Sequence, residues 1–358
     1  MTQHSLPAKA TAAAALLCLS SSVSTGFTVP SVQPAAQSLS FGKAASTASP
    51  QAPHASPLSQ TAGAMSSAGQ IAALSAAVGV AAGAASRMRR TATKSPEETY
   101  KAVLGGGEVR LAAPMGEVIL SGIVTGFYIG FGGVLCSTVG GSALGLPPGL
   151  QRFLFGAVGF PLSIFLTTIA GGQGFTPNVA VMASAVLRKG SADEDKSIKF
   201  ETMFKNLVYA YIGNAIGLIT IAYLANLGNL PAVPAAIIIA KHKVFDYSAA
   251  ALLFRAVLGG WLIGLAVWTS QAAESVSAKF VTIWLCISTY VICQYEHCLA
   301  NLFFVPCAIF AGAKITWGQF IMQNLIPTTI GNFLGGFLML AGSYRLVYGK
   351  HGVIKAPA

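Results

Sequence analysis

Charged side chains are scarce in this sequence. Lys, Arg, Asp and Glu together make up 9% of its 358 residues, hydrophobic residues make up 54%, and the mean hydropathy is +0.64. A soluble globular domain carries about 25% charged residues. The composition therefore excludes an ordinary soluble protein and predicts an integral membrane protein.

Acidic residues are absent from the first 96 positions, and the first to appear is Glu97. The same segment carries six basic residues, which are Lys9, Lys43, Arg87, Arg89, Arg90 and Lys94. These account for much of the formal net charge of +11, and the other basic residues are spread over loops. A nucleic-acid-binding domain concentrates its Lys and Arg in one patch or stripe. We therefore expect no nucleic-acid partner.

The acid-free segment has the layout of a targeting leader. Residues 1–26 combine a polar start, a short apolar stretch and small residues, which is typical of a signal peptide and too short to span a membrane. Residues 27–96 are rich in Ala, Ser, Thr, Pro and Gln, as transit peptides are, and contain a second apolar stretch at 71–85. Their start, Phe27-Thr28-Val29-Pro30, resembles plastid leaders of algae whose plastids came from secondary endosymbiosis.

We therefore predict that residues 1–96 are a bipartite leader and that the protein lies in a plastid (chloroplast) envelope. The alternative is a disordered tail behind a secretory signal, with the plasma membrane as the destination. The two interpretations differ in the address of the protein and not in its membrane domain.

The sequence also lacks the motifs of an enzyme or a metal site. It contains no HExxH, no nucleophile elbow and no redox motif. Its six cysteines imply no disulfide framework, and Cys293, His297 and Cys298 fall short of the four ligands of a structural zinc. We expect no metal, no cofactor and no enzymatic activity. A membrane enzyme that uses Glu296, His297 and Cys298 is the alternative, but it would need a second group of catalytic residues.

Six apolar segments approach the length that a helix needs to cross a bilayer, about 20 residues. They cover 118–135, 153–187, 207–227, 249–269, 280–313 and 325–347. A shorter apolar piece at 235–240 is expected to be re-entrant or peripheral. We predict an all-α membrane protein with a six-span domain over 97–350 and a C-terminal tail over 351–358.

The second and fifth segments are interrupted near their centres. Three glycines and a proline between Gly171 and Pro177 are unfavourable inside a helix, and polar residues interrupt the fifth segment between Glu296 and Pro306. These two spans hold equivalent positions in two halves of three spans each, and such halves have opposite orientations. Paired interruptions of this kind indicate the binding site of an inverted-repeat transporter.

Three motifs in these spans resemble the formate/nitrite transporter family. They are Gly174-Phe175-Thr176 in the second span, Glu296-His297-Cys298-Leu299-Ala300-Asn301-Leu302-Phe303 in the fifth, and Ile326-Pro327-Thr328-Thr329-Ile330-Gly331-Asn332 at the start of the sixth. The resemblance covers residues 115–348 or so. It implies an aquaporin-like protomer with two inverted repeats, a homopentamer in membrane lipid, and one anion path through each protomer.

The resemblance also implies roles for individual residues. His297 takes the position of the central pore histidine, Thr176 faces it from the break in the second span, and Asn301 lies one turn after it. Lys243 takes the position of the vestibule lysine that draws anions in, and Glu296 is expected to be structural. Two hydrophobic constrictions are implied at Phe160, Ile164, Phe175 and Tyr290.

Two positions depart from the family pattern. Gln173 stands where many members have an acid, and Gly260 stands where many have an asparagine in the fourth span. The second departure removes a side-chain amide near the path. We expect it to affect the selectivity of the path and not the fold.

The chemistry of a small anion explains why such a path would need a histidine. Moving a bare anion through an apolar region is prohibitive, but formate and nitrite become small neutral acids once protonated. Histidine, with an ordinary pKa of about 6.5, lends and recovers a proton near neutral pH. The sequence therefore predicts a channel for nitrite or formate, with nitrite favoured in a plastid. Proton-linked transport of lactate or another short monocarboxylate is the alternative, and a neutral-solute channel is disfavoured because Asn-Pro-Ala is absent.

Overall fold

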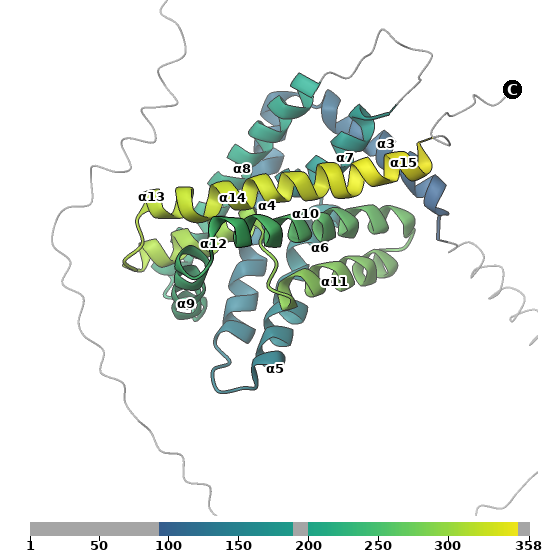
Figure 1. Ribbon diagram of the computed structural model, residues 1–358. Helices are drawn as coiled ribbons and strands as arrows, with labels where there is room; N and C mark the ends of the chain where they lie inside the picture. Colours follow the sequence, from purple (N-terminus) through teal and green to yellow (C-terminus); the bar gives the residue numbers. More distant parts are fainter. Residues whose placement is uncertain (1–92, 189–199, 350–358) are drawn as a thin grey trace, which may run out of the picture. The chain divides into compact units, whose positions relative to one another are not determined.

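The fold is known from a computed structural model that describes residues 93–188 and 200–349 (Figure 1). All of these residues belong to one compact unit. The predicted tail, and all but the last four residues of the predicted leader, lie outside the described residues. The six-span domain is therefore the part of the prediction that the structure describes.

The first half of the domain contains three membrane spans. The first span is α4 (Met115–Cys136), which continues into the π-helical turn η1 (Ser137–Gly141). The second span is interrupted, and it comprises α5 (Pro148–Phe153), η2 (Leu154–Gly159), α6 (Pro161–Ile169) and, after the break, α7 (Phe175–Val186). The third span is the long helix α8 (Phe200–Leu227). A further helix, α3 (Pro96–Ala112), precedes the first span.

The second half repeats this plan with the same order of elements. Helix α9 (Ala232–Phe245) precedes the fourth span, which is α10 (Ala249–Ala272). The fifth span is interrupted between α11 (Val276–Ile292) and α12 (Cys298–Phe310). The sixth span runs through α13 (Trp317–Gln319), η4 (Phe320–Leu325), α14 (Ile326–Leu334), η5 (Gly335–Gly342) and α15 (Ser343–Tyr348). The predicted six spans in two repeats are confirmed, with the second and fifth broken.

The two interruptions lie where the backbone leaves helical geometry. In the second span, Gly171 adopts a left-handed φ of 90°, and the helix resumes at Phe175. In the fifth span, Gln294 adopts a left-handed φ of 58°, and the helix resumes at Cys298. The prediction that the fifth span is broken as far as Pro306 was wrong, because Pro306 lies inside α12. The surrounding protein buries α12 from Cys298 to Ala308, and tertiary packing stabilises a helix against the loss of one hydrogen bond at proline.

Glycines allow the first and third spans to approach at backbone distance. A Cβ atom built on Gly126 of α4 would lie 2.5 Å from the carbonyl oxygen of Asn214 in α8, and one on Gly217 of α8 would lie 2.2 Å from the carbonyl oxygen of Ile123. Gly122 and Gly126 of α4 are four positions apart, as are Gly213 and Gly217 of α8. These glycines form a contact seam, which small residues commonly provide between membrane helices.

The same kind of contact is found at Gly260. A Cβ atom at this position would lie 2.4 Å from the carbonyl oxygen of Asn332, so α10 and α14 touch backbone to backbone there. An asparagine at position 260 would collide with α14. At this departure from the family pattern, the fourth and sixth spans are in backbone contact.

This packing gives a stability prediction. We expect Gly126→Ala to lower the unfolding free energy by about 1–3 kcal/mol, the usual range for overpacking a well-filled interface. Gly116→Ala in the same helix is the matched control, because no atom lies within 4 Å of a Cβ placed there. Thermal unfolding of the detergent-solubilised protein measures both variants. Equal midpoints for the two variants would contradict the contact seam.

Candidate functional site

An asparagine of the third span holds the break in the second span. The side-chain oxygen of Asn214 accepts a hydrogen bond of 2.8 Å from the backbone N–H of Phe175, the first residue of α7. Its side-chain nitrogen donates to the carbonyl oxygens of Gly122 (2.8 Å) and Gln173 (2.9 Å). One buried amide therefore satisfies backbone groups on both sides of the break and ties them to α4.

An asparagine of the sixth span holds the break in the fifth span in the same way. The side-chain oxygen of Asn332 accepts a hydrogen bond of 2.9 Å from the backbone N–H of Cys298, the first residue of α12. Its side-chain nitrogen donates to the carbonyl oxygens of Ala256 (2.8 Å) and Glu296 (2.9 Å). The two inverted repeats thus hold their breaks with the same set of hydrogen bonds, and each set, around Asn214 or Asn332, is called a clamp below. The dipeptide Gly-Asn, at Gly213-Asn214 and Gly331-Asn332, is the sequence signal that could have revealed the clamps.

The clamped breaks bring Thr176 and His297 together. His297 is the last residue before α12 and has an extended backbone, with φ −134° and ψ 119°. Its Nε2 atom lies 3.0 Å from the hydroxyl oxygen of Thr176, although the two residues are 121 positions apart. Both side chains are buried. Among the described residues, the second ring nitrogen of His297, Nδ1, has no hydrogen-bond partner.

A cavity of about 750 Å³ reaches His297 from one side of the protein. Its inner wall contains three aromatic residues from three elements. Phe160 lies 5.9 Å from Tyr290 and 6.4 Å from Phe304, measured between ring centroids. The Tyr290 ring lies 6.0 Å from the His297 ring. An anion in the cavity would therefore meet an apolar aromatic lining immediately before the histidine.

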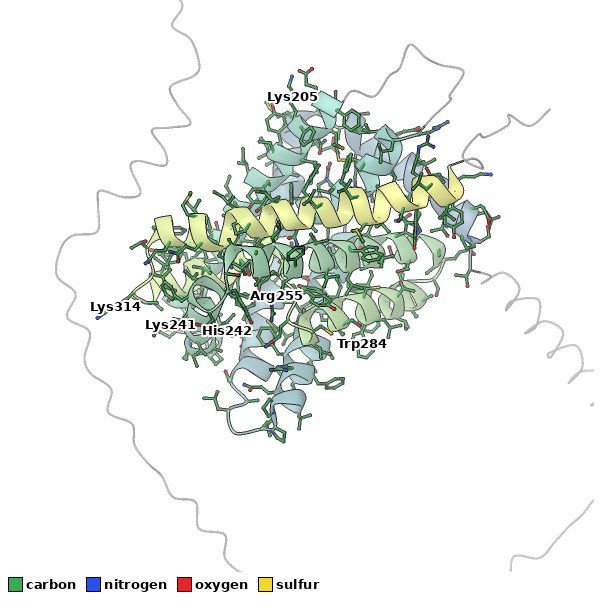
Figure 2. All side chains as sticks on the ribbon, in the orientation of Figure 1. Lys205, Lys241, His242, Arg255, Trp284 and Lys314 are labelled. Atoms are coloured by element: carbon green, nitrogen blue, oxygen red, sulfur yellow. The ribbon has the colours of Figure 1, made fainter. Side chains whose placement is uncertain are left out.

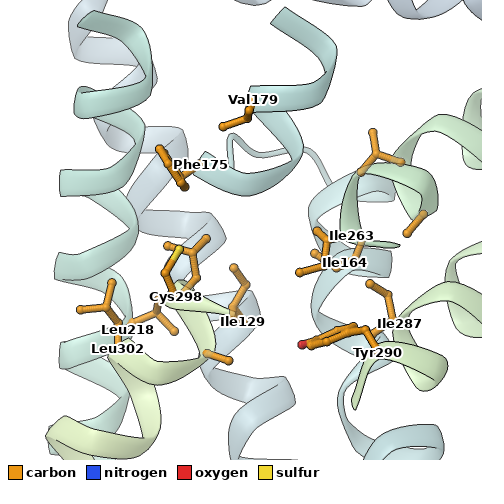
Figure 3. Packing of buried hydrophobic residues seen from close by; sticks show 14 of the residues in the cluster. Ile129, Ile164, Phe175, Val179, Leu218, Ile263, Ile287, Tyr290, Cys298 and Leu302 are labelled. Atoms are coloured by element: carbon orange, nitrogen blue, oxygen red, sulfur yellow. The ribbon is translucent and has the colours of Figure 1, made fainter. Parts of the chain in front are cut away.

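The four predicted constriction residues fall into two groups. Phe160 and Tyr290 line the cavity, whereas Ile164 and Phe175 are buried away from its walls. Figure 3 shows Ile164 beside Ile263 and Phe175 at the start of α7. Phe175 packs edge-to-face on Tyr211 at 5.0 Å between centroids. Phe304 also lines the cavity, next to Phe160.

Lys243 and Glu296 form a buried ion pair beside the cavity. The ammonium of Lys243 lies 2.8 Å from both carboxylate oxygens of Glu296, and the Glu296 side chain is 3% exposed. Both residues line the cavity, and within the protein the charge of Lys243 is balanced by the carboxylate of Glu296.

Asn301 belongs to the same network. Its side-chain nitrogen donates to Glu296 (2.9 Å) and to the side-chain oxygen of Asn324 (2.7 Å). Asn324 in turn donates to the backbone carbonyl of Lys243 at 3.0 Å. The amide donors of Asn301 are therefore engaged by the protein, and within the part of the chain that the structure describes only its side-chain oxygen lacks a partner.

Arg255 packs on Tyr247, which is one of the residues that line the cavity. The Arg255 guanidinium lies 4.2 Å from the Tyr247 ring centroid and donates to the carbonyl of Gln294 at 2.6 Å, so it holds the left-handed residue of the fifth-span break. The Tyr247 hydroxyl pairs with His242, which also pairs with Asp246. Burial raises the pKa of Tyr247. Figure 2 shows Lys241, His242 and Arg255 gathered at this end.

The Lys243–Glu296 pair gives a second prediction. Removing one partner of a buried ion pair lowers the unfolding free energy by about 3–5 kcal/mol, because it leaves a charge uncompensated. We therefore expect Lys243→Met and Glu296→Gln each to destabilise the protein by several kcal/mol, and the double variant to recover part of the loss. A double-mutant cycle on unfolding midpoints measures the coupling. Additive losses would show that the pair is not coupled.

The fold and the site together define a class of protein. Two inverted repeats with interrupted helices meet at a buried histidine and threonine, and an aromatic-lined cavity leads to them. Interrupted helices of this kind form the substrate sites of membrane transporters and channels. The class is therefore that of membrane transport proteins and not of enzymes.

Comparison with known proteins identifies the family. The family model described as formate/nitrite transporter matches residues 97–346. The chain is 36% identical over 277 residues to a probable formate transporter of Methanothermobacter thermautotrophicus, a match that covers 72% of this chain and 98% of that protein. It is 28% identical over 241 residues to the nitrite transporter NirC of Escherichia coli strain K12, covering 66% of this chain and 85% of that protein.

The fold is likewise similar to a solved structure of a pentameric formate channel with formate bound. The TM-score is 0.57 at 26% sequence identity, and the match covers 65% of this chain and 97% of that one. The chain belongs to the formate/nitrite transporter family, as its motifs indicated. The members of this family are transporters and channels, and the expectation that the protein is not an enzyme is confirmed.

Proposed function

We propose that the protein conducts nitrite or formate across a membrane, with transient protonation of the anion by His297. The observation that carries the proposal is the contact of 3.0 Å between His297 and Thr176, which joins the two interrupted spans at the inner end of the cavity. The relatives include a probable formate transporter and a nitrite transporter, which supports both anions as candidate substrates.

The apolar lining accounts for the need for a proton. A bare anion that leaves water for the surroundings of Phe160, Tyr290 and Phe304 loses its hydration, and a charged group is far more costly to desolvate than a neutral one. A proton passed from the His297 imidazolium to the anion gives a neutral acid and a neutral imidazole. When the acid ionises again, the proton returns to the imidazole or leaves with the anion. The first case gives anion flux and the second gives proton-coupled flux.

Thr176 supports this step by holding the ring. Its hydroxyl contacts Nε2 of His297, which leaves Nδ1 as the ring atom without a partner among the residues that the structure describes. Two helices also begin at this depth, α7 and α12, and the N-terminal end of a helix favours negative charge. The anion therefore meets positive helix ends where the proton is transferred.

Flux measurements test the histidine mechanism. We expect His297→Ala to reduce nitrite and formate flux into liposomes at least tenfold under an imposed pH gradient, because the proton donor is lost. Thr176→Val should reduce flux as well, and Thr176→Ser should restore it because the hydroxyl returns. Lys205→Gln is the matched control, since Lys205 is exposed, pairs with Glu201 and lies away from the cavity-lining Lys241 and His242 (Figure 2).

The outcomes separate the competing functions. Unchanged flux in His297→Ala would overturn the histidine mechanism, and faster lactate than nitrite or formate flux would favour the monocarboxylate alternative. No flux of any anion in the wild-type protein would contradict the proposed function itself. Glycerol flux through the wild-type protein without flux of any anion would favour a neutral-solute channel.

The assembly and the location are part of the proposal. The solved formate channel to which the fold is similar is a pentamer, and we propose a homopentamer for this chain. Helix α8 carries exposed apolar residues at Val208, Ile212 and Ile216, an outer face that suits lipid or a neighbouring protomer. We propose a plastid envelope as the location, with residues 1–96 as the leader and the plasma membrane as the alternative.

The location has its own test. We expect a fluorescent protein fused behind residues 1–96 to accumulate in plastids, because this segment combines a signal-like start with an acid-free, transit-like stretch. Fluorescence microscopy in an alga with secondary plastids measures the distribution. The control fusion lacks residues 1–26. A reporter that stays in the cytosol, or that reaches the plasma membrane, would contradict the plastid address.

A further inference from the structure

Tyr290 differs from its two aromatic neighbours on the inner wall of the cavity, Phe160 and Phe304, by a hydroxyl group. The sequence resemblance implies a purely hydrophobic constriction at this position, which would not need that oxygen. Tyr290 is 3% exposed, and its hydroxyl has no hydrogen-bond partner among the described residues. Burying a polar group without a partner is unfavourable, so the presence of this hydroxyl needs an explanation.

The position of the hydroxyl distinguishes it from other buried polar groups. Within residues 93–188 and 200–349, ten buried side-chain nitrogen and oxygen atoms lack a partner. Only two of them belong to residues that line the cavity, and these are the Tyr290 hydroxyl and Nδ1 of His297. The two rings lie 6.0 Å apart between centroids, at an interplanar angle of 80°. Two neighbouring rings at the inner end of the cavity therefore each carry an unsatisfied polar atom.

The aromatic rings beside His297 enclose both of these atoms. Phe160 packs edge-to-face on Tyr290 at 5.9 Å between centroids and stacks on Phe304 at 6.4 Å. The Tyr290 hydroxyl points away from Ile287 of its own helix, α11 (Figure 3). An anion that moves from the cavity to the imidazole has to push Phe160 and Tyr290 apart. This movement uncovers the hydroxyl at the moment when the anion loses its water.

We propose that the Tyr290 hydroxyl is a specificity-determining contact of the path, which forms a hydrogen bond with the anion as it passes the aromatic rings on its way to His297. A hydroxyl both donates and accepts. The same group can therefore donate to an oxygen of formate or nitrite and, after protonation, accept from the O–H of the neutral acid. The inference rests on the proposed function for the identity of the anion.

The contact favours small oxyanions over other solutes. Formate and nitrite each present oxygen atoms that accept a hydrogen bond, and the free energy lost by burying the hydroxyl without a partner is then regained. A solute of similar size that neither accepts nor donates a hydrogen bond leaves the hydroxyl unpaired. The residue thus adds selection by hydrogen bonding to selection by size at the aromatic rings.

Removing the hydroxyl alone tests the contact. Tyr290→Phe keeps the ring and its packing on Phe160 and His297. We expect it to lower formate and nitrite flux into liposomes about three- to tenfold, which is the effect of losing one hydrogen bond. The unfolding midpoint should stay the same or rise, because the variant removes a buried polar group that has no partner. Lower flux without lower stability is a result that a role in packing would not produce.

Tyr100→Phe is the matched control. Tyr100 is 1% exposed, its hydroxyl also lacks a partner within the part of the chain that the structure describes, and it is not one of the cavity-lining residues. This variant should affect the midpoint in the same direction and leave flux at the wild-type level.

The outcomes distinguish the contact from the proposed function. Wild-type flux in Tyr290→Phe would overturn the contact alone, and so would an equal loss of flux in Tyr290→Phe and Tyr100→Phe. No flux of formate or nitrite in the wild-type protein would contradict the proposed function, and the contact with it.

Discussion

Every backbone polar group at membrane depth needs a partner, and the two interrupted spans create groups that helices alone do not satisfy. Asn214 and Asn332 supply those partners from the neighbouring spans. Each asparagine fixes the first N–H of a half-helix and the carbonyl two residues before it. Thr176 and His297 each lie one residue from a clamped N–H, so their contact depends on both clamps.

The clamps in turn depend on glycine. Asn214 reaches the break in the second span because α4 and α8 touch at Gly126 and Gly217, where a Cβ atom would meet backbone atoms within 3 Å. Asn332 reaches the other break across the same kind of contact at Gly260. A larger side chain in either seam would separate the helices and withdraw the amide from the backbone that it satisfies. The geometry of the site therefore depends on the close packing of the spans at these glycines.

The sequence predicted those features that follow from local composition. Apolar length located the six spans, and the glycines after Ala170 located the first break. The expected second break extends too far, to Pro306, because polar residues and a proline in an apolar run weigh against a continuous helix. A buried helix accommodates a polar residue such as Asn301 when a partner from another span engages it. Pairings such as Lys243 with Glu296 join residues 53 positions apart, and no pattern along the chain specifies which spans will face each other. The recurrence of Gly-Asn in the third and sixth spans is the local signal most closely related to these contacts between spans.

The position of the Lys243–Glu296 pair beside His297 connects structure with mechanism. An unpaired carboxylate next to the histidine would repel an approaching anion and compete with it for the proton. The ammonium of Lys243 compensates that charge at 2.8 Å, so the region around His297 is close to electrically neutral. The helix ends and the imidazole then determine how an anion is received. In the proposed mechanism, the pairing of Glu296 with Lys243 removes a negative charge that would repel the anion, and His297 therefore stays available to it.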